Sequence, residues 1–419
     1  MGLALTGAPP VRTRPFPGWP LFDESEEDSL IDVLKSGRWG GYSERIAEFE
    51  SAFATLHQMR YAVSCANGTV ALELALRAAG ISCGDEVIVP AITFISTATS
   101  VLLCHGVPIF ADIDPQTLNL CPAEAERLIT RRTRAIIVVH FGGHPADMDA
   151  FQEIAKRHGI ALIEDAAHAH GAIWRGCPVG NFGLAATFSF QSFKLITSGE
   201  GGIVLTNSQE IANKVWSYCN QGRQKDRGWY EHFTLGTNYR LTGFQAAILM
   251  RQLARLTEQT CKREENIAYF RDQLRSAPAF VLSKPDPRVD RHPNYLITLR
   301  YRAAELKGVL RDTIIRGLRA EGIPAEPFYP HPLYRNPLFT DTNLPPCQCG
   351  RWHASQDYRT LQLPESERIC SEGIWLPHNI FLGTRDDVDD VLEALYRLQQ
   401  NAAALIDFER MESALERRP

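Results

Sequence analysis

The sequence lacks any long apolar run and any block of basic residues. Its apolar stretches are interrupted by polar residues well short of a membrane span, so we expect no transmembrane helix and no membrane partner. No segment is rich in lysine or arginine, and the net charge is -5, which argues against nucleic-acid binding. The N-terminal segment also lacks the charged region and the long apolar core of a signal peptide. These absences favour a soluble globular protein.

Cysteine is also scarce, with ten residues in a chain of 419. The cysteines are scattered over helix-like and strand-like segments, which favours free thiols and a cytoplasmic location. Cys347, Cys349 and His353 lie close together, but their spacing fits no common zinc pattern, so we predict no metal site. A chain of this length is too long for one ordinary core and favours a large domain with a smaller one.

Lysine is scarce too, and one of the eight lysines has unusual neighbours. Seven lie among polar or charged residues, whereas Lys194 follows the run LAATFSFQSF and precedes Leu195, Ile196 and a glycine-rich turn. Because a desolvated amine has a lowered pKa, such a lysine can form an imine with an aldehyde near neutral pH. The alternative is a lysine that extends its amine from a strand end into solvent.

Short apolar runs alternate with amphipathic helical stretches between residues 62 and 207. The runs are near-continuous in Val, Ile, Leu, Ala and Phe, as expected of strands that are covered on both faces. They span 86–91, 107–113, 134–141, 160–166, 185–190 and 201–206. This alternation predicts an α/β fold with a mainly parallel sheet, in which ligands bind at the carboxyl ends of the strands.

The second half of the chain has a different pattern. A long helix is predicted over 242–275, and the segments NYLITLRY and IWLP have the composition of strands. Further helices are predicted over 305–321 and 386–416. We therefore predict a large domain over 1–262, which includes an N-terminal arm, and a small α+β domain over 263–419.

Several polar residues fall at predicted strand ends and helix starts, where a cofactor would bind. Asp165 closes the strand IALIED, and an acid there can hold a protonated ring nitrogen, although a helix cap or a surface acid explains it equally well in isolation. Gly68 and Thr69 open a helix, where backbone N–H groups bind anions, although a plain N-cap is the simpler explanation. Ser189 could add a hydroxyl to the same phosphate. Phe94 could stack on a planar ring, although core packing explains most phenylalanines.

Together with Lys194, these residues supply an imine-forming amine, an acid, a phosphate cradle and a stacking face. That set is the one required to bind pyridoxal 5'-phosphate. Random agreement among all four features is a poor explanation, so we predict an enzyme that uses this cofactor.

The motifs that carry these residues resemble those of the DegT/StrS-type sugar aminotransferases. They read ANGTVALELAL, GDEVIVPAITFISTATSV, ADIDPQTLNL, IEDAAHAHGA, TFSFQSFKLITSGEGG and NYRLTGFQAAIL. Members of this family use pyridoxal 5'-phosphate and have the fold type I architecture of aspartate aminotransferase. The resemblance implies that Lys194 forms the imine with the cofactor, that Asp165 contacts the pyridine nitrogen, and that His168 lies beside the cofactor's 3-hydroxyl.

The same resemblance implies roles for the remaining candidates. Gly68, Thr69 and Ser189 match phosphate ligands, and Phe94 matches the aromatic residue that stacks on the ring. Asn238 matches an asparagine that reaches the phosphate in a neighbouring subunit. A homodimer with shared active sites follows from this last match.

Departures from the family pattern indicate the substrate. Nucleotide-sugar members usually have histidine where this chain has Gln191, and the ending WLPHNIFLG is closer to two other branches. These are the glutamine:scyllo-inosose aminotransferases and the 3-amino-5-hydroxybenzoate synthases. The resemblance therefore implies transfer of an amino group from L-glutamine or L-glutamate to a keto cyclitol or keto sugar, in the biosynthesis of an aminoglycoside or another secondary metabolite.

Two alternatives stay open at this stage. An NDP-4-keto-hexose could be the acceptor, because Arg223, Lys225 and Arg227 are available to meet a diphosphate. A 3-amino-5-hydroxybenzoate synthase-like reaction on the same cofactor is the other. Tyr329 and His331 are candidate contacts of the acceptor, although an ordinary surface loop explains them as well.

Overall fold

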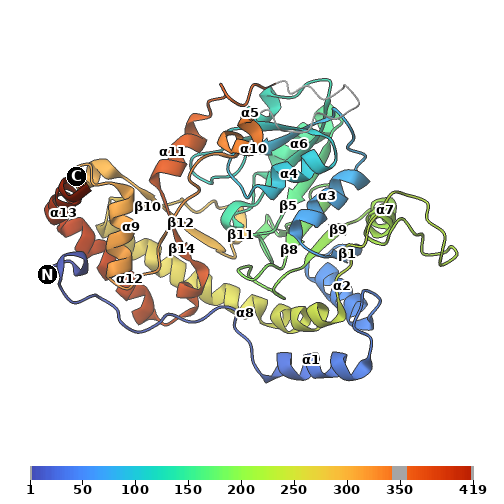
Figure 1. Cartoon of the computed structure of the whole chain (residues 1–419), viewed down its shortest axis with the longest axis horizontal. Coiled ribbons are helices and arrows are strands. Elements are labelled where there is room, and N and C mark those ends of the chain that lie inside the picture. Colours follow the sequence, from blue (N-terminus) through green and yellow to red (C-terminus); the bar gives the residue numbers. More distant parts are fainter. Residues whose placement is uncertain (1, 342–355, 417–419) are drawn as a thin grey trace.

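The computed structural model describes residues 2–341 and 356–416, and a seven-stranded sheet forms its centre (Figure 1). The strand order is β1-β9-β8-β5-β4-β2-β3. The strands are β1 (Tyr61–Cys65), β2 (Glu86–Pro90), β3 (Val107–Ala111), β4 (Thr133–Val139), β5 (Ala161–Asp165), β8 (Ala185–Ser189) and β9 (Gly202–Thr206). All neighbouring pairs from β8 to β3 are parallel, whereas β9 is antiparallel to both β8 and β1. The prediction of an α/β fold with a mainly parallel sheet is confirmed.

Helices cover both faces of this sheet, which explains why its strands are apolar throughout. One face packs against α3 and α7, and the other packs against α2, α6 and the first half of α8. The helices that flank the sheet are α2 (Glu44–Leu56), α3 (Gly68–Ala78), α4 (Ser96–Leu103), α5 (Pro122–Arg127), α6 (Met148–His158), α7 (Gln209–Cys219) and α8 (Gly243–Gln273). Helix α1 (Glu24–Ser36) packs along α8 outside these layers (Figure 1).

The C-terminal part contains a four-stranded antiparallel sheet in the order β10-β12-β14-β13. Its strands are β10 (Phe280–Leu282), β12 (Leu296–Tyr301), β13 (Glu326–Pro327) and β14 (Gly373–Pro377). The accompanying helices are α9 (Arg311–Ala320), α10 (Pro337–Thr340), α11 (Pro364–Glu372), α12 (Arg385–Gln400) and α13 (Ala402–Glu416). A small third sheet consists of β6 (Ile173–Trp174), β7 (Cys177–Pro178) and β11 (Val289–Arg291), so that it joins the two halves of the chain.

Two helices predicted in this part have different limits. The helix predicted over 305–321 begins only at Arg311, because the preceding 3-10 turn η4 (Ala303–Leu306) ends at Lys307 and Gly308, which both have positive φ. The helix predicted over 386–416 is divided into α12 and α13, because Asn401 leaves the helical conformation between them.

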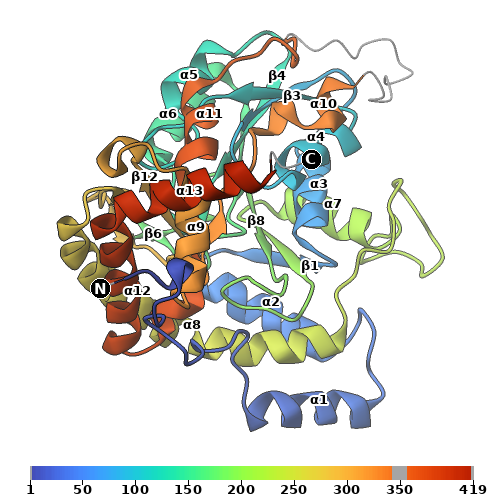
Figure 2. The same cartoon turned by 60° about the vertical axis from the view of Figure 1, so that its left-hand side comes forward.

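The first residues of the chain, 2–23, form an N-terminal arm that lies against α9 and α12 (Figure 2). Leu3 belongs to the core around the C-terminal sheet, and the carboxylate of Glu321 accepts hydrogen bonds from two N–H groups of the arm. Conversely, the core beside α3 receives side chains from the C-terminal part of the chain, namely those of Leu333, Tyr334, Phe339, Tyr358 and Leu363. The division of the chain into domains at residue 262 stays a prediction.

Within residues 2–341 and 356–416, no helix is long and apolar enough to cross a membrane. Among the cysteines in residues 2–341 and 356–416, seven are free thiols, whereas Cys83, which is half-buried in the turn before β2, is disulfide-bonded. The expectation of free thiols is therefore wrong for Cys83, because a cysteine that is only half-buried in a turn is accessible to a second thiol. Cys347, Cys349 and His353 lie outside the described residues.

Candidate active site

A cavity of about 930 Å³ opens at the carboxyl ends of the parallel strands. Its walls come from β5 and β8, from the first turns of α3 and α4, from the segment that follows β8, and from β12 and β14. Eight residues predicted from the sequence line it: Gly68, Thr69, Phe94, Asp165, His168, Ser189, Lys194 and Tyr329. The fold thus brings together predicted residues that are up to 261 positions apart in the sequence.

Lys194 lies in a tight segment of residues 190–198, which we call the Lys194 turn. Its backbone N–H donates to the carbonyl of Gln191 at 2.8 Å, and its Nζ lies 4.5 Å from the centroid of the Tyr295 ring. Burial lowers the pKa of the Lys194 amine to about 8, although the nearby Asp165 carboxylate acts in the opposite direction. A substantial fraction of this amine is therefore neutral and nucleophilic near physiological pH.

Asp165 occupies the last position of β5 and is buried. Its Oδ2 accepts a hydrogen bond from Thr97 Oγ1 at 2.9 Å, and its Oδ1 accepts one from the N–H of Ala167 at 3.2 Å. Burial raises the pKa of Asp165, while these two donors and the charge of Lys194 favour its ionised form. The carboxylate is held in one orientation by groups that stabilise its charge.

His168 follows Asp165 by three residues and is also buried. Burial, together with the charge of Lys194, lowers the pKa of His168 far below its usual value, so the ring is neutral. The N–H of Gly142 donates to His168 Nδ1 at 3.3 Å, which leaves the ring proton on Nε2. His168 can therefore act as a hydrogen-bond donor through Nε2.

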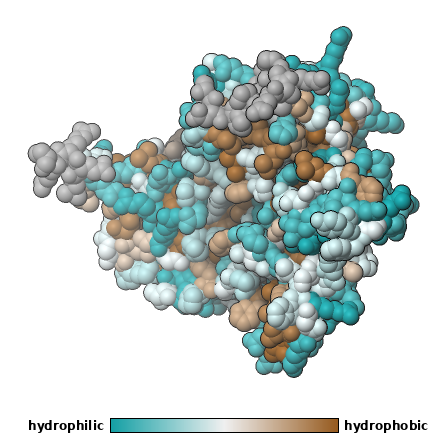
Figure 3. All heavy atoms as spheres, turned by 45° about the vertical axis from the view of Figure 1, so that its right-hand side comes forward, coloured by the Kyte–Doolittle hydropathy of each residue, from teal (hydrophilic) through white to brown (hydrophobic). Residues whose placement is uncertain are grey.

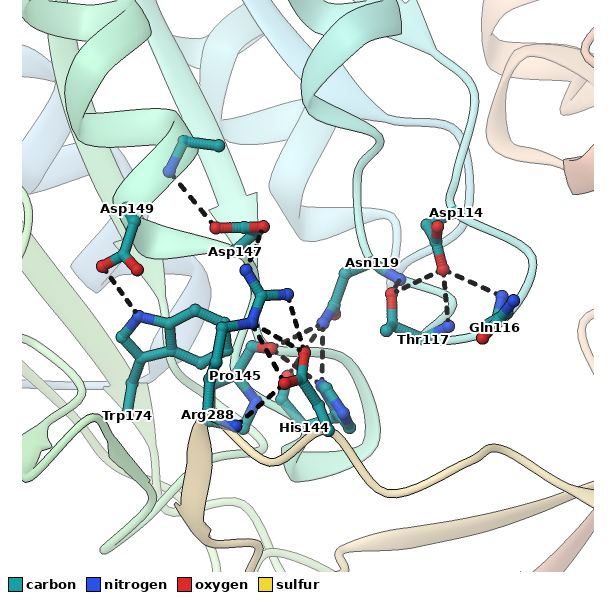
Figure 4. A network of polar contacts seen from close by, with 12 residues as sticks. Asp114, Gln116, Thr117, Asn119, His144, Pro145, Asp147, Asp149, Trp174 and Arg288 are labelled. Carbon is teal, nitrogen blue, oxygen red and sulfur yellow. Dashed lines mark hydrogen bonds and ion pairs between the residues drawn. The ribbon is translucent and has the colours of Figure 1, made fainter.

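The segment that carries Gly142 is itself fixed by a polar network (Figure 4). The side-chain amide of Asn119 donates to the carbonyls of His144 and Pro145, and its oxygen accepts from the N–H of Phe141. Residues before and after Gly142 are thus tied to one buried side chain. Because of this support, the donor to His168 has little freedom to move.

The N-terminus of α3 forms an anion-binding cradle. Gly68 is its first residue, and the side chain of Asn67 caps the helix by accepting from the N–H of Val70 at 2.9 Å. A Cβ at Gly68 would lie 2.7 Å from Ser189 Cβ, so only glycine lets the two segments approach this closely. Free N–H groups, the positive end of the helix dipole and the hydroxyls of Thr69 and Ser189 suit a phosphate.

Phe94 lies just before α4 at the edge of the cavity and has an exposed fraction of 57%. A phenylalanine in the core would be covered, so core packing does not explain its position. Its ring is available to a planar ligand, which is consistent with the stacking role predicted for it.

Two predicted site residues do not line this cavity. Asn238 is exposed in the segment between α7 and α8, where it forms an isolated bridge with Asn220. His331 is half-buried, and its Nδ1 lies 3.1 Å from the carbonyl of Pro332. Tyr334, from the same loop, is fully buried and donates to Glu367 at 2.6 Å.

Sequence reasoning missed three residues of the site. Thr97 supports Asp165, Tyr295 lies against both Lys194 and His168, and Trp375 contributes to the wall beside Tyr329. Thr97 could have been found from its place as the second residue of the helix after β2. No pattern in the sequence places Tyr295 or Trp375 near Lys194, since both come from the C-terminal sheet region.

The donor set fits pyridoxal 5'-phosphate, because each part of that molecule has a counterpart in the cavity. The partly neutral amine of Lys194 suits the aldehyde, and the buried carboxylate of Asp165 suits the pyridine nitrogen. The cradle between α3 and Ser189 suits the phosphate. Together with the mainly parallel sheet, this site defines a pyridoxal phosphate-dependent enzyme with the fold of aspartate aminotransferase.

Comparison with known proteins identifies the family. The chain belongs to the DegT/DnrJ/EryC1/StrS aminotransferase family, whose model matches residues 20–396. It is therefore a pyridoxal phosphate-dependent aminotransferase.

Three similar proteins illustrate the range of the family. The L-glutamine:2-deoxy-scyllo-inosose aminotransferase of Streptomyces lividus is 36% identical over 419 residues, covering 96% of this chain and 99% of its own. The structure of a 3-amino-5-hydroxybenzoic acid synthase has a TM-score of 0.82 and 33% identity, covering 94% of this chain and all of its own. The NtdA structure from Bacillus subtilis, with bound pyridoxamine phosphate, has a TM-score of 0.76 and 26% identity, covering 90% of this chain and 82% of its own.

Proposed function

We propose that this enzyme transfers an amino group from L-glutamine or L-glutamate to a keto cyclitol or an unlinked keto sugar, in the biosynthesis of an aminoglycoside or another secondary metabolite. The observation that carries the proposal is the charge of the cavity. Among the described residues that line it, Lys194 is the single lysine and arginine does not occur, whereas Glu73 and Glu200 are present. Such a wall suits a neutral polyhydroxylated acceptor better than a nucleoside diphosphate, which needs basic partners.

Each residue of the site has a defined part in this proposal. When bound, the cofactor supplies the electron sink that makes the donor's Cα proton acidic. Lys194 Nζ takes up that proton while the donor loses its amino group. It delivers a proton to the acceptor's carbon when the acceptor gains the amino group. Asp165 would keep a proton on the pyridine nitrogen, and His168 would donate through Nε2 to the 3-hydroxyl oxygen. Gly68, Thr69 and Ser189 would hold the phosphate, while Phe94 would stack on the ring.

The acceptor would occupy the side of the cavity formed by Tyr329 and Trp375. The two rings meet edge to face, with centroids 4.8 Å apart. Burial raises the pKa of the Tyr329 phenol, which keeps its hydroxyl protonated as a donor. Aromatic faces beside hydroxyl donors are typical of sites that bind sugars and cyclitols.

A half-reaction assay tests the acceptor. The enzyme is first loaded with an amino group from L-glutamine, and scyllo-inosose, 2-deoxy-scyllo-inosose or an NDP-4-keto-hexose is then added. We expect the cyclitol ketones to discharge the enzyme at least tenfold faster than the nucleotide sugar. Faster discharge by the nucleotide sugar would contradict the proposal and favour the alternative acceptor. A Lys194→Ala variant serves as the control, and it should lose the cofactor absorbance and all turnover.

We further propose that the active enzyme is a homodimer in which a second copy covers the mouth of the cavity. Large apolar side chains are exposed near the cavity and in the segment after α7, with exposed fractions of 68% for Phe193, 75% for Trp229 and 84% for Leu235. Figure 3, which turns this side of the molecule forward, shows apolar residues gathered around a recess. Burial of such a surface against a second copy would explain it, and would let Asn238 reach the partner's phosphate.

Mixing two inactive variants tests the shared site. Lys194→Ala and Asn238→Ala homodimers should each be impaired, whereas a hybrid of the two would contain one intact site if Asn238 acts across the interface. We expect exchange of subunits to restore about a quarter of the wild-type activity in an equal mixture, since half the dimers are hybrids with one working site each. No restoration, with hybrids present by mass spectrometry, would place Asn238 in its own chain's site.

We also place the enzyme in the cytoplasm, where its amino donor is abundant. The seven free cysteines support this location, whereas the disulfide at Cys83 is a feature against it. Fractionation of the producing cell tests the assignment, which would be wrong if the protein were recovered outside the cytosolic fraction.

A further inference from the structure

The Lys194 turn is held from outside by two side chains that come from opposite ends of the sequence. The indole Nε1 of Trp19 donates to the carbonyl of Ser192 at 3.0 Å. Nε2 of His378 lies 3.2 Å from the carbonyl of Phe193. These are the two peptide groups immediately before Lys194, so both hydrogen bonds bear directly on the backbone that carries the amine.

The two donors also support each other. The rings of Trp19 and His378 meet edge to face, with centroids 4.5 Å apart and an interplanar angle of 82°. The next residue, Asn379, donates through Nδ2 to the carbonyl of Pro17 at 2.6 Å, which fastens the N-terminal arm to η6 (His378–Leu382). The arm and the C-terminal part therefore form a single support for the turn.

His378 is in the protonation state that this support requires. It is buried, and burial together with the charge of Arg263 lowers its pKa to about 3, so the ring is neutral with a single N–H. Because Nε2 faces a carbonyl oxygen, which only accepts, the proton must be on Nε2. Nδ1 has no partner among the described residues.

A column of rings continues from this support to the reacting groups. His378 lies 6.0 Å from Tyr295, and Tyr295 lies 4.5 Å from His168, measured between ring centroids. Lys194 Nζ contacts the Tyr295 ring in the same column. Movement of His378 would thus displace both the backbone of the Lys194 turn and the Tyr295 ring that the Lys194 amine contacts.

We infer that Trp19 and His378 are positioning residues that hold the Lys194 turn so that Nζ stays over the Tyr295 ring and points into the cavity. The bonds within the turn would survive their loss, since Gln191 still accepts from the N–H groups of Phe193 and Lys194. The turn would therefore keep its shape but lose its fixed place. This inference rests on the proposed role of Lys194 in proton transfer.

The effect of losing one of these hydrogen bonds on kcat can be estimated. A hydrogen bond of ordinary strength changes an equilibrium between the docked and the displaced turn by about two- to tenfold. A displacement of the amine reduces the proton-transfer rate more than it reduces donor binding. We therefore expect kcat to fall by about two- to tenfold with KM for L-glutamine nearly unchanged.

The test uses the holoenzyme and two pairs of variants. Trp19→Phe keeps a ring against His378 but removes the donor, and Trp39→Phe is its matched control, because Trp39 Nε1 donates to the carbonyl of Leu34 at 3.1 Å in another part of the chain. His378→Leu removes the second donor, whereas His378→Gln offers an amide N–H in its place. Hydrogen exchange in a peptide that spans the Lys194 turn is measured beside the steady-state rates.

We expect Trp19→Phe and His378→Leu to raise hydrogen exchange in the peptide that spans the Lys194 turn and to lower kcat, while Trp39→Phe changes neither. We also expect His378→Gln to recover most of what His378→Leu loses. Exchange and kcat in Trp19→Phe equal to those of Trp39→Phe would overturn the inference, as would equal losses in His378→Gln and His378→Leu. If His378→Leu fails to fold, the Trp19 pair decides.

Failure of the proposed function would have a different signature. In that case Lys194→Ala would retain cofactor absorbance and turnover, whatever the exchange data show. Failure of the present inference leaves Lys194→Ala inactive and the turn equally protected in all other variants. The two outcomes are therefore separable in one set of proteins.

Discussion

Replacement of Gly68 by alanine gives a quantitative test of the phosphate cradle. The new Cβ would lie 2.7 Å from Ser189 Cβ and 3.1 Å from Ser189 Oγ, both far inside van der Waals contact. The conflict is relieved by moving Ser189 away from α3, which carries its hydroxyl out of the cradle. Overpacking of this kind costs about 1–3 kcal/mol. Cofactor binding requires Ser189 to return to its place in the cradle, so this steric free energy weakens binding. The dissociation constant of the cofactor should therefore rise by about five- to 150-fold.

The stability of the cofactor-free protein should behave differently. Alanine in place of glycine in a helix is favourable by about 0.5–1 kcal/mol, which offsets part of the steric cost once Ser189 has moved. Titration of the cofactor-free variant with pyridoxal 5'-phosphate, followed by absorbance, gives the dissociation constant, and thermal unfolding gives the stability. Gly40→Ala is the control, because its Cβ would meet nothing within 4 Å. A Gly68→Ala variant that binds the cofactor within twofold of the control would refute the assignment of the cradle.

Three further predictions follow from charges in the structure. Thr97→Val removes the donor to Asp165 and raises the pKa of that carboxyl further, so the acid limb of the pH–rate profile should move to higher pH by about 1–2 units. Burial lowers the pKa of Lys194 to about 8, so the rate of cofactor rebinding should level off above pH 8 instead of rising to pH 10. Burial raises the pKa of Asp387, but hydrogen bonds and Arg12 hold it below its usual value, so its contribution to stability is present at neutral pH and lost in acid. Arg12→Ala should therefore cost about 3–5 kcal/mol in urea denaturation at pH 7, and less at low pH.

The strands of the large sheet could be predicted from the sequence because burial on both faces gives each a continuous apolar run. Each of the six predicted strands matches an observed one to within two residues at either end. The antiparallel direction of β9 could not be found in this way, because direction depends on the path of the chain between β8 and β9. The path of the N-terminal arm could not be predicted either, because Arg12 is ordinary in sequence and its partners Asp387 and Asp390 lie far away in the chain.

The candidate site could be predicted in part, for a related reason. Asp165 ends β5, Lys194 follows β8 and Gly68 begins the helix after β1. The carboxyl ends of parallel strands meet at one edge of the sheet. The local sequence around each of these residues was therefore enough to predict that it lies at this edge of the sheet. Trp375 reaches the cavity from β14 and Tyr295 from the residue just before β12, and the docking of this second sheet against the first leaves no local pattern.

The contrast between Lys194 and His378 shows why the chemistry was easier to find than its support. A lysine among apolar residues is conspicuous, because an unpaired buried charge would be unfavourable without a function. A neutral histidine that donates to a carbonyl costs little to bury, so nothing in its neighbours distinguishes it from other core residues. The amine that reacts must be electrostatically unusual, whereas the groups that hold it need only be in the right place. For that reason the residues that position Lys194 come from the two ends of the chain and become recognisable only when the fold joins them.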